Sequence, residues 1–306
     1  MNSTRKNKTL VVIGGPTASG KSAAAAKLAL HYHSEVISAD ARQLYREMKI
    51  GTAVPDPAEL LGVPHHFLQQ ISLSEDYNAS RYESEVLTLC EELFEKHDVL
   101  FLAGGSGLYI DAVCCGIDEL PSYDPRIRET LAGRLHNEGL ASLRDELKSL
   151  DPLSYERIDL NNPMRVLKAL EISIQTGRPY SSFLTHSERE RPFRILRIAL
   201  DPGREELYER INSRVSRMMD AGLEEEARKL YPLRHLTALK TVGYRELFSY
   251  FEGKTTLEEA VDLIRRNTRK YARKQTTWFR KEGKYRWFLP EDITGMIAWI
   301  DEHKMG

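Results

Sequence analysis

The sequence predicts an α/β fold, with a parallel sheet core flanked by helices and an all-helical insertion domain. Short apolar runs alternate with helical patterns at the start of the chain, and a glycine-rich loop follows the first run. Strand patterns then disappear from about residue 118 to 195. Alternating strands and helices favour a parallel sheet, because each connecting helix returns the chain to the same edge.

The individual elements follow from apolar periodicity. Short β-branched or apolar runs predict buried strands, at residues 9–14, 35–38, 99–103, 194–200 and 285–289. Helical patterns are found at residues 22–32, 79–96, 126–139, 140–150, 163–176, 205–221, 224–231 and 257–281. Gly177 is a stop signal for the third helix of the insertion.

These patterns divide the chain into three parts. Residues 1–117 form the first part of the core, 118–195 form the helical insertion, and 196–306 complete the core with basic C-terminal helices. A helical insertion within one α/β core is the simplest architecture that explains this order.

Composition limits the class of protein without naming a function. The chain has 306 residues and a formal net charge of −1, so bulk charge neither indicates nor excludes a nucleic-acid partner. Cys90, Cys114 and Cys115 lack metal-binding or paired spacing, which favours a reducing compartment. No stretch approaches the roughly 18 apolar residues of a spanning helix. We therefore expect a cytoplasmic protein that does not enter a membrane.

The glycine-rich loop fits the phosphate-loop pattern GxxxxGK[ST] and lies between a predicted strand and a predicted helix, as the motif requires. Backbone amides and the helix N-terminus can face phosphate oxygens there. Lys21 supplies a mobile positive charge, and the Ser22 hydroxyl can ligate Mg²⁺ on the same phosphates. The core is therefore of the P-loop type. The alternative is a glycine-rich turn without a ligand. The loop consists of Gly15, Pro16, Thr17, Ala18, Ser19, Gly20, Lys21 and Ser22.

An aspartate occupies the position where a ligand crevice is expected. P-loop NTPases use a strand-end acid to organise the metal, but the strand at 99–103 runs directly into Gly104 and Gly105. Asp40 instead follows the strand at 35–38, at the sheet edge that holds ligands in open α/β folds. Asp40 could therefore take a proton from an attacking group. The alternative is a helix cap or a salt-bridged loop acid.

Seven sequence blocks, in order, resemble those of the tRNA dimethylallyltransferase family. They span the chain from about residue 10 to 288, at residues 15–22 (GPTASGKS), 37–53, 63–66 (VPHH), 104–110 (GGSGLYI), 161–179, 242–246 (VGYRE) and 268–279. The resemblance implies transfer of a dimethylallyl group from dimethylallyl diphosphate to the exocyclic amine of the adenosine 3′ to the anticodon. It also implies an insertion that grips the tRNA anticodon stem-loop. We expect a monomer of the bacterial type, without the C-terminal zinc finger of eukaryotic relatives.

The resemblance also assigns roles to individual residues. Asp40 and Thr17 are implied as catalytic, and Arg214 is implied to bind the diphosphate together with residues 15–22. For Arg214 the alternative is a surface ion pair with a nearby glutamate. The implied tRNA-binding residues are Asp40, Ala41, Arg42, Gln43, Ser106, Arg128, Met164, Arg165, Val166, Leu167, Lys168, Lys240, Thr241, Val242, Gly243, Tyr244 and Arg245.

Four positions depart from the family pattern. Ala41 replaces a usual serine, Glu47 a common glycine, Val54 a frequent lysine and Ser106 a common threonine. None of them is Thr17, Asp40 or Lys21, so the departures concern specificity rather than the reaction.

The C-terminal region supports a nucleic-acid partner. Residues 265–286 hold ten Lys and Arg against one acid, with aromatic residues between them, which is typical of a surface that follows a phosphate backbone. A solvated helix face is the alternative.

Three other functions compete with tRNA prenylation. They are a nucleoside-type or shikimate-type kinase, isopentenyl transfer to free AMP or ADP, and non-enzymatic RNA binding by a P-loop protein. The insertion and the basic C-terminus disfavour the kinase, a long insertion is foreign to the AMP-dependent class, and Asp40 disfavours a protein without catalysis.

Overall fold

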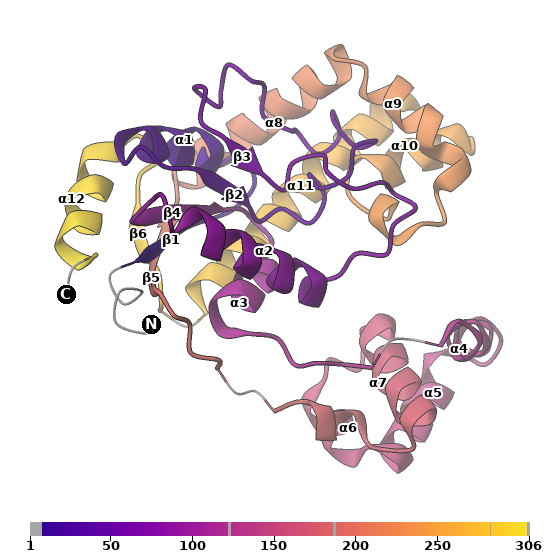
Figure 1. The fold of residues 1–306 in the computed structure, drawn as a ribbon. Helices are drawn as coiled ribbons and strands as arrows, with labels where there is room; N and C mark the ends of the chain where they lie inside the picture. The colour runs from indigo at the N-terminus through magenta and orange to yellow at the C-terminus, as the bar shows by residue number, and fades with distance from the viewer. Residues whose placement is uncertain (1–7, 122–123, 186–187, 282, 305–306) are drawn as a thin grey trace. The chain divides into compact units, whose positions relative to one another are not determined.

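The computed structural model describes residues 8–121, 124–185, 188–281 and 283–304. Six strands form one sheet in the order β3-β2-β4-β1-β5-β6, and each pairing is parallel (Figure 1). The strands are β1 Thr9–Gly14, β2 Val36–Ser38, β3 His65–His66, β4 Val99–Ala103, β5 Arg194–Leu200 and β6 Arg286–Phe288. The predicted parallel α/β core is confirmed.

The central strand explains why the sheet is covered on both faces. All six residues of β1 are buried, and the strand pairs with β4 on one side and β5 on the other. A strand that buries both alternating sets of side chains needs helices above and below it. On one face, α1 and α12 contribute Leu28, Met296 and Ile300 to the cluster that contains Val11 and Ile13.

The core unit, residues 1–115 and 190–306, contains most of the helices. They are α1 Lys21–His31, α2 Ala79–Leu93, α3 Gly107–Cys115, α8 Arg204–Asp220, α9 Leu223–Leu230, α10 Tyr244–Phe251, α11 Leu257–Arg280 and α12 Ile293–His303. None of the helices in the described ranges is long and apolar enough to cross a membrane. Two short 3₁₀ turns, η3 Tyr231–Leu233 and η4 Thr237–Leu239, connect α9 to α10.

The insertion forms a second compact unit, residues 116–189. It contains α4 Pro125–Asn137, α5 Gly139–Leu150, α6 Pro152–Arg157, α7 Pro163–Thr176 and η2 Tyr180–Phe183. Three of the helices begin at a proline whose preceding side chain accepts a hydrogen bond from a backbone amide near the helix start, a sequence-encoded start signal. These capping residues are Asp124, Asp151 and Asn162. Gly177 ends α7, as predicted, and it adopts the left-handed conformation there.

The second unit has its own hydrophobic core, to which Leu131, Leu143, Leu147, Val166 and Leu170 contribute. The expected range of 118–195 extends beyond it at the C-terminal end. Residues 194 and 195 pair with Thr9 and Leu10, so they belong to the central sheet.

The predicted elements lie within three residues of the observed ones, but several short elements were not predicted. They are β3, α3, α6, α10 and α12. The two residues of β3 are too few for a period to register, and α3 begins at the last glycine of a run that indicates a turn.

Candidate active site

A cavity of about 420 Å³ opens where β1, β2 and β4 end. The phosphate loop, Asp40 and the turn Gly104–Gly105 line it, together with residues from α8 and α11 and the loop 51–55. The cavity therefore lies at the sheet edge where the sequence predicts a ligand.

The phosphate loop has the backbone that its glycines predict. Gly20 has φ +88° and stands immediately before α1, so the first turn of the helix faces the loop. A side chain at Gly15 would place its Cβ 2.8 Å from the carbonyl oxygen of Leu200 on β5, so this position requires glycine. The Nζ of Lys21 donates to the carbonyl of Pro16 at 2.5 Å.

Two cations meet at this loop. Arg214 of α8 donates from Nη1 to the Thr17 hydroxyl at 3.3 Å, which brings a residue distant in sequence to the loop. Burial and the charge of Arg214 lower the pKa of Lys21 to about 7, although Asp40 acts in the opposite direction. Burial also lowers the pKa of Arg214. Two buried positive charges with depressed pKa values indicate a site prepared for an anion.

Asp40 lines the same cavity, and its carboxylate also organises the following turn. Its Oδ1 accepts from the backbone amides of Arg42 at 2.9 Å and Gln43 at 3.3 Å. Within the part of the chain that the structure describes, no hydrogen bond falls on Oδ2. One carboxylate oxygen therefore caps the turn that follows β2, and the side chain also lines the cavity.

Gln275 of α11 is a site residue that sequence reasoning missed. Its Oε1 accepts from the Thr17 amide at 2.8 Å, and its Nε2 donates to the carbonyl of Gly105 at 2.9 Å. The side chain is 7% exposed and joins the phosphate loop to the turn after β4. The only signal in the sequence is a polar residue on the buried stripe of a helix.

The departures from the family pattern are accommodated locally. The Ser106 hydroxyl accepts from the backbone amide of Ala41 at 2.9 Å, a contact that does not depend on the side chain at position 41. Glu47 accepts from the Ser72 hydroxyl at 2.7 Å and the Leu73 amide at 3.2 Å. Val54 lies in the segment between β2 and β3, and nothing in the structure explains why valine occupies this position.

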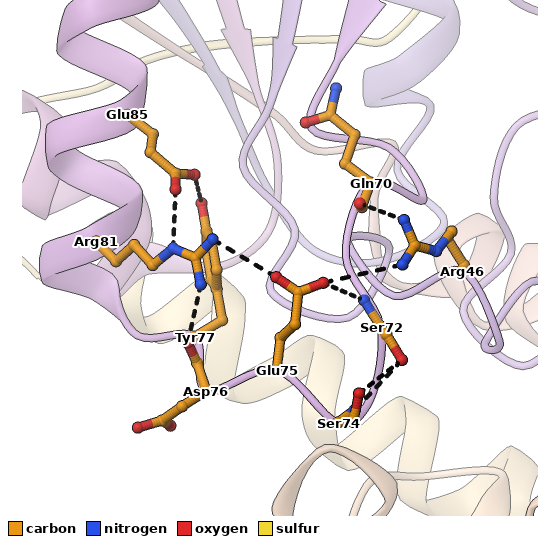
Figure 2. Close-up of polar contacts among 9 residues, drawn as sticks. All are labelled: Arg46, Gln70, Ser72, Ser74, Glu75, Asp76, Tyr77, Arg81 and Glu85. Carbon is orange, nitrogen blue, oxygen red and sulfur yellow. Dashed lines mark hydrogen bonds and ion pairs between the residues drawn. The ribbon is translucent and has the colours of Figure 1, made fainter.

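A polar network holds the neighbouring segment. Figure 2 shows Glu75 between Arg46, 3.9 Å away, and Arg81, 3.6 Å away. Arg46 also donates to the carbonyl of Gln70 at 2.8 Å, and Arg81 pairs with Glu85 at 2.8 Å. These contacts connect Arg46 to the segment 70–85.

The expected tRNA-binding residues of the core unit differ in their surroundings. Arg42, Gln43, Thr241, Val242 and Gly243 line the cavity, and Lys240 and Arg245 are exposed. Tyr244, in contrast, is completely buried and donates to Glu226 at 2.7 Å. Its side chain therefore presents no surface to RNA in this structure, because the sequence block continues into the buried face of α10.

The expected tRNA-binding residues of the insertion also include both exposed and buried side chains. Met164 and Arg165 are exposed, and Leu167 and Lys168 are partly exposed. Val166 is completely buried in the insertion's core, so its side chain presents no surface to RNA in this structure. Arg128 is half-exposed, and its Nη2 pairs with the buried carboxylate of Glu171 at 3.0 Å.

The basic C-terminal run is only partly a free surface. Arg265 and Arg269 are bound to Asp262 and Asn212, and Arg280 pairs with Asp201 at 2.8 Å. Arg266, Lys270, Arg273 and Lys274 of α11 are exposed. Tyr271 and Trp278 are each 45% exposed on this helix, and the Trp278 ring packs over Gly107.

Two adjacent histidines and two cysteines complete the inventory of candidate metal ligands near the sheet. His66 pairs with Glu35 at 2.6 Å, and His65 Nδ1 contacts the carbonyl of Val63 at 2.8 Å. No group of three or more metal-ligating side chains is found in the described ranges. Burial raises the pKa of Cys90 and of Cys114 to about 12, so both remain thiols at neutral pH.

Comparison with known proteins agrees with this geometry. The profile described as "IPP transferase" matches residues 43–282. The chain is 48% identical over 292 residues to tRNA dimethylallyltransferase 1 of Phocaeicola vulgatus, covering 95% of this chain and 97% of the relative. It is similar to the crystal structure of tRNA isopentenylpyrophosphate transferase from Bacillus halodurans, with a TM-score of 0.70 and 36% identity over 98% of this chain and 97% of that one.

A more distant comparison concerns the fold alone. A eukaryotic dimethylallyltransferase acting on tRNA matches with a TM-score of 0.77 at 23% identity, covering 96% of this chain and 78% of that one. The extent of the sequence match settles membership. The chain belongs to the IPP transferase family.

Proposed function

We propose that this protein transfers a dimethylallyl group from dimethylallyl diphosphate to the exocyclic amine of the adenosine 3′ to the anticodon of tRNA, and releases diphosphate. One observation carries the proposal beyond family membership. Lys21, Arg214 and Asp40 line a single cavity, so an anion site and a candidate base are close together. The named relatives support the same reaction.

The anion site suits a leaving diphosphate. Negative charge develops on the diphosphate as the allylic C–O bond breaks, and fixed donors stabilise that charge. The loop amides, Lys21 and Arg214 are such donors, and the Thr17 hydroxyl is held by Arg214. The depressed pKa of Lys21 supports this role, because an incoming anion would restore the ordinary pKa.

The loop also fits a Mg²⁺ ion. Ser22 lines the cavity beside Lys21, and Mg²⁺ in phosphate sites takes few protein ligands, with phosphate oxygens and water completing its shell. Ser22 would hold the ion, which would add positive charge to the diphosphate.

An apolar wall is available for the five-carbon tail. Aliphatic side chains line the cavity, among them Leu61, Leu68, Val215, Met218 and Ile264. A phosphoryl donor has no need of such a wall, whereas an allylic group does.

Asp40 would act as the base. The lone pair of an adenine amine is delocalised into the ring, so the amine is a weak nucleophile, and a base that accepts its proton during attack offsets this weakness. As the N–C bond forms, that proton passes to the Asp40 carboxylate. Such a base contributes roughly 10²–10⁴-fold.

Recognition of tRNA, the acceptor, is proposed from the surfaces that are expected to bind RNA. An amine within a stacked pair is inaccessible, so a loop adenosine suits this chemistry. We propose that the insertion grips the anticodon stem-loop, that the exposed basic residues of α11 follow its backbone, and that the enzyme works as a monomer in the cytoplasm, where tRNA is found.

The deciding experiment is an acceptor assay without nucleoside triphosphate. Radiolabelled dimethylallyl diphosphate and Mg²⁺ are incubated with the protein and with bulk tRNA, free AMP or free ADP. We expect label in tRNA alone. Label in AMP or ADP would support the cytokinin-type reaction, and a requirement for ATP with phosphoryl transfer would support the kinase.

The variant Asp40→Asn separates the role of Asp40 as a base from its role in holding the following turn. Asparagine keeps an oxygen for the amides of Arg42 and Gln43, so the turn should persist. Single-turnover transfer should fall by roughly 10²-fold or more, with tRNA affinity within a few-fold. Near-normal turnover would remove Asp40 from the role of base.

A further inference from the structure

Glu226, a carboxylate outside the site described so far, holds one wall of the cavity. From α9 it accepts the backbone amides of three successive residues, Lys49 at 3.0 Å, Ile50 at 2.8 Å and Gly51 at 2.8 Å. Successive backbone amides that converge in this way form an anion-binding nest, and here the anion that they bind is the Glu226 carboxylate. Glu226 therefore fixes the start of the loop 49–53, whose residues 51–53 line the cavity.

Tyr244 completes this anchor. Its hydroxyl donates to Glu226 Oε1 at 2.7 Å, while its ring lies so close to Gly51 that a Cβ there would stand 2.6 Å from it. Burial and the charge of Glu226 raise the pKa of the tyrosine, so the hydroxyl keeps its proton and continues to donate. The loop is thus bonded to a carboxylate and packed against a ring.

The loop is connected to the candidate base through Gln43. The Nε2 of Gln43 donates to the carbonyls of Thr52 and Ala53, each at 3.0 Å. The backbone amide of the same residue donates to Asp40 Oδ1 at 3.3 Å. A displacement of loop 49–53 would therefore move Gln43 and with it the turn that holds Asp40. The network of Figure 2 secures residue 46 and not this loop.

We propose that Glu226 is a positioning residue for the transfer reaction, which it serves by fixing loop 49–53 and, through Gln43, the Asp40 carboxylate. The inference rests on the proposed function. A misplacement of about 1 Å at a reacting group can cost about 10²-fold in rate, even when the change lies away from the chemistry. Substrate affinity depends on the phosphate loop and the RNA surface, so the effect should fall on kcat.

The test compares Glu226→Gln with Glu225→Gln. Both remove one negative charge from α9, but Glu225 is exposed. Glutamine offers one acceptor oxygen, and its amino group would meet the amides that now donate to Glu226. We expect kcat for tRNA to fall roughly tenfold or more in Glu226→Gln, with KM for tRNA and diphosphate affinity within about threefold. Glu225→Gln should match the wild type. Equal kcat values for the two variants would overturn the proposal, as would a loss confined to KM.

Hydrogen exchange gives a readout that is independent of activity. The amides of residues 49–51 should exchange faster in Glu226→Gln than in Glu225→Gln. Unchanged exchange would overturn the proposal. If the wild type transfers nothing to tRNA, the proposed function fails, while exchange still tests the hold on the loop. Should Glu226→Gln not fold, Tyr244→Phe keeps the ring and removes one of the four hydrogen bonds. It should raise exchange and lower kcat to a smaller extent, and an unchanged kcat would count against the idea.

Discussion

Lys21 and Arg214 bring two positive charges into one cavity, and burial, together with the charge of Arg214, lowers the pKa of Lys21 to about 7. Near neutral pH a substantial part of the free protein therefore carries a neutral Lys21. A diphosphate beside the ammonium group favours the charged form, so the pKa must rise on binding. Below pH 7 the lysine is already charged. Above pH 7 binding must take up a proton.

This gives a prediction about pH. Diphosphate affinity should be flat below about pH 7 as far as Lys21 is concerned, and above it should fall by up to about tenfold per pH unit until the pKa of the complex is reached. Lys21→Arg is the matched control, since arginine stays charged throughout. Calorimetric titration with inorganic diphosphate from pH 6 to 9 measures both proteins, and the ligand's own ionisation cancels in their ratio. A constant ratio across this range would contradict the prediction.

At the scale of elements, α11 connects parts of the site that lie far apart in the sequence. Gln275 lies between Tyr271 and Trp278 on this helix and bonds to Thr17 and to Gly105. Its two contacts come from residues that follow different strands, so α11 keeps the ends of β1 and β4 in a fixed relation. A buried donor and a buried acceptor would both lose their partner if the amide were removed.

Gln275→Met should reveal this link. Methionine has a similar length but no hydrogen-bonding amide, so the Thr17 amide and the Gly105 carbonyl would be left unsatisfied, at about 1–3 kcal/mol each. We expect a lower free energy of unfolding in urea and weaker diphosphate binding. Lys274→Met introduces the same side chain on the exposed face and should change the free energy of unfolding by less than about 0.5 kcal/mol. Equal stability of the two variants would show that the link is dispensable.

Element length also determines what the sequence can predict. The long periodic helices and the apolar strands were predicted because period and burial agree over many residues, and the phosphate loop and Asp40 were found because each is encoded locally. Gln275 and Glu226 were missed because their partners are backbone groups contributed by other elements. A hydrogen bond between a side chain and a distant amide leaves no pattern at the level of spacing. Tyr244 and Val166 show the opposite limit. Both belong to sequence blocks expected to bind tRNA, but both are fully buried, because such a block contains surface residues and core residues alike.

At the scale of the whole molecule, the cavity and the insertion belong to different units. Every residue that lines the cavity lies in the core unit, and the insertion buries its own apolar cluster. The two ends of the insertion leave the core close together. The Arg191 guanidinium donates to the carbonyls of Val113 at 2.8 Å and Ala112 at 2.7 Å and pairs with Glu83 at 2.6 Å. A short linker could therefore replace residues 116–189 without displacing β5.

We predict that this replacement separates donor binding from RNA binding. A core with a Gly-Ser linker between Cys115 and Glu190 retains β5 and the Arg191 contacts, so it should unfold cooperatively and bind inorganic diphosphate within a few-fold of the full chain. Its affinity for an anticodon stem-loop should fall by at least tenfold, because the implied grip is gone. Calorimetry and fluorescence anisotropy measure the two affinities. In the full-length chain, Arg165→Glu gives a milder version, which should reduce the slope of log affinity against log salt by about 0.7–0.9 if one phosphate contact is lost. Undiminished stem-loop affinity of the shortened protein would place the RNA site in the core, and loss of diphosphate binding would show that the two units are not separable.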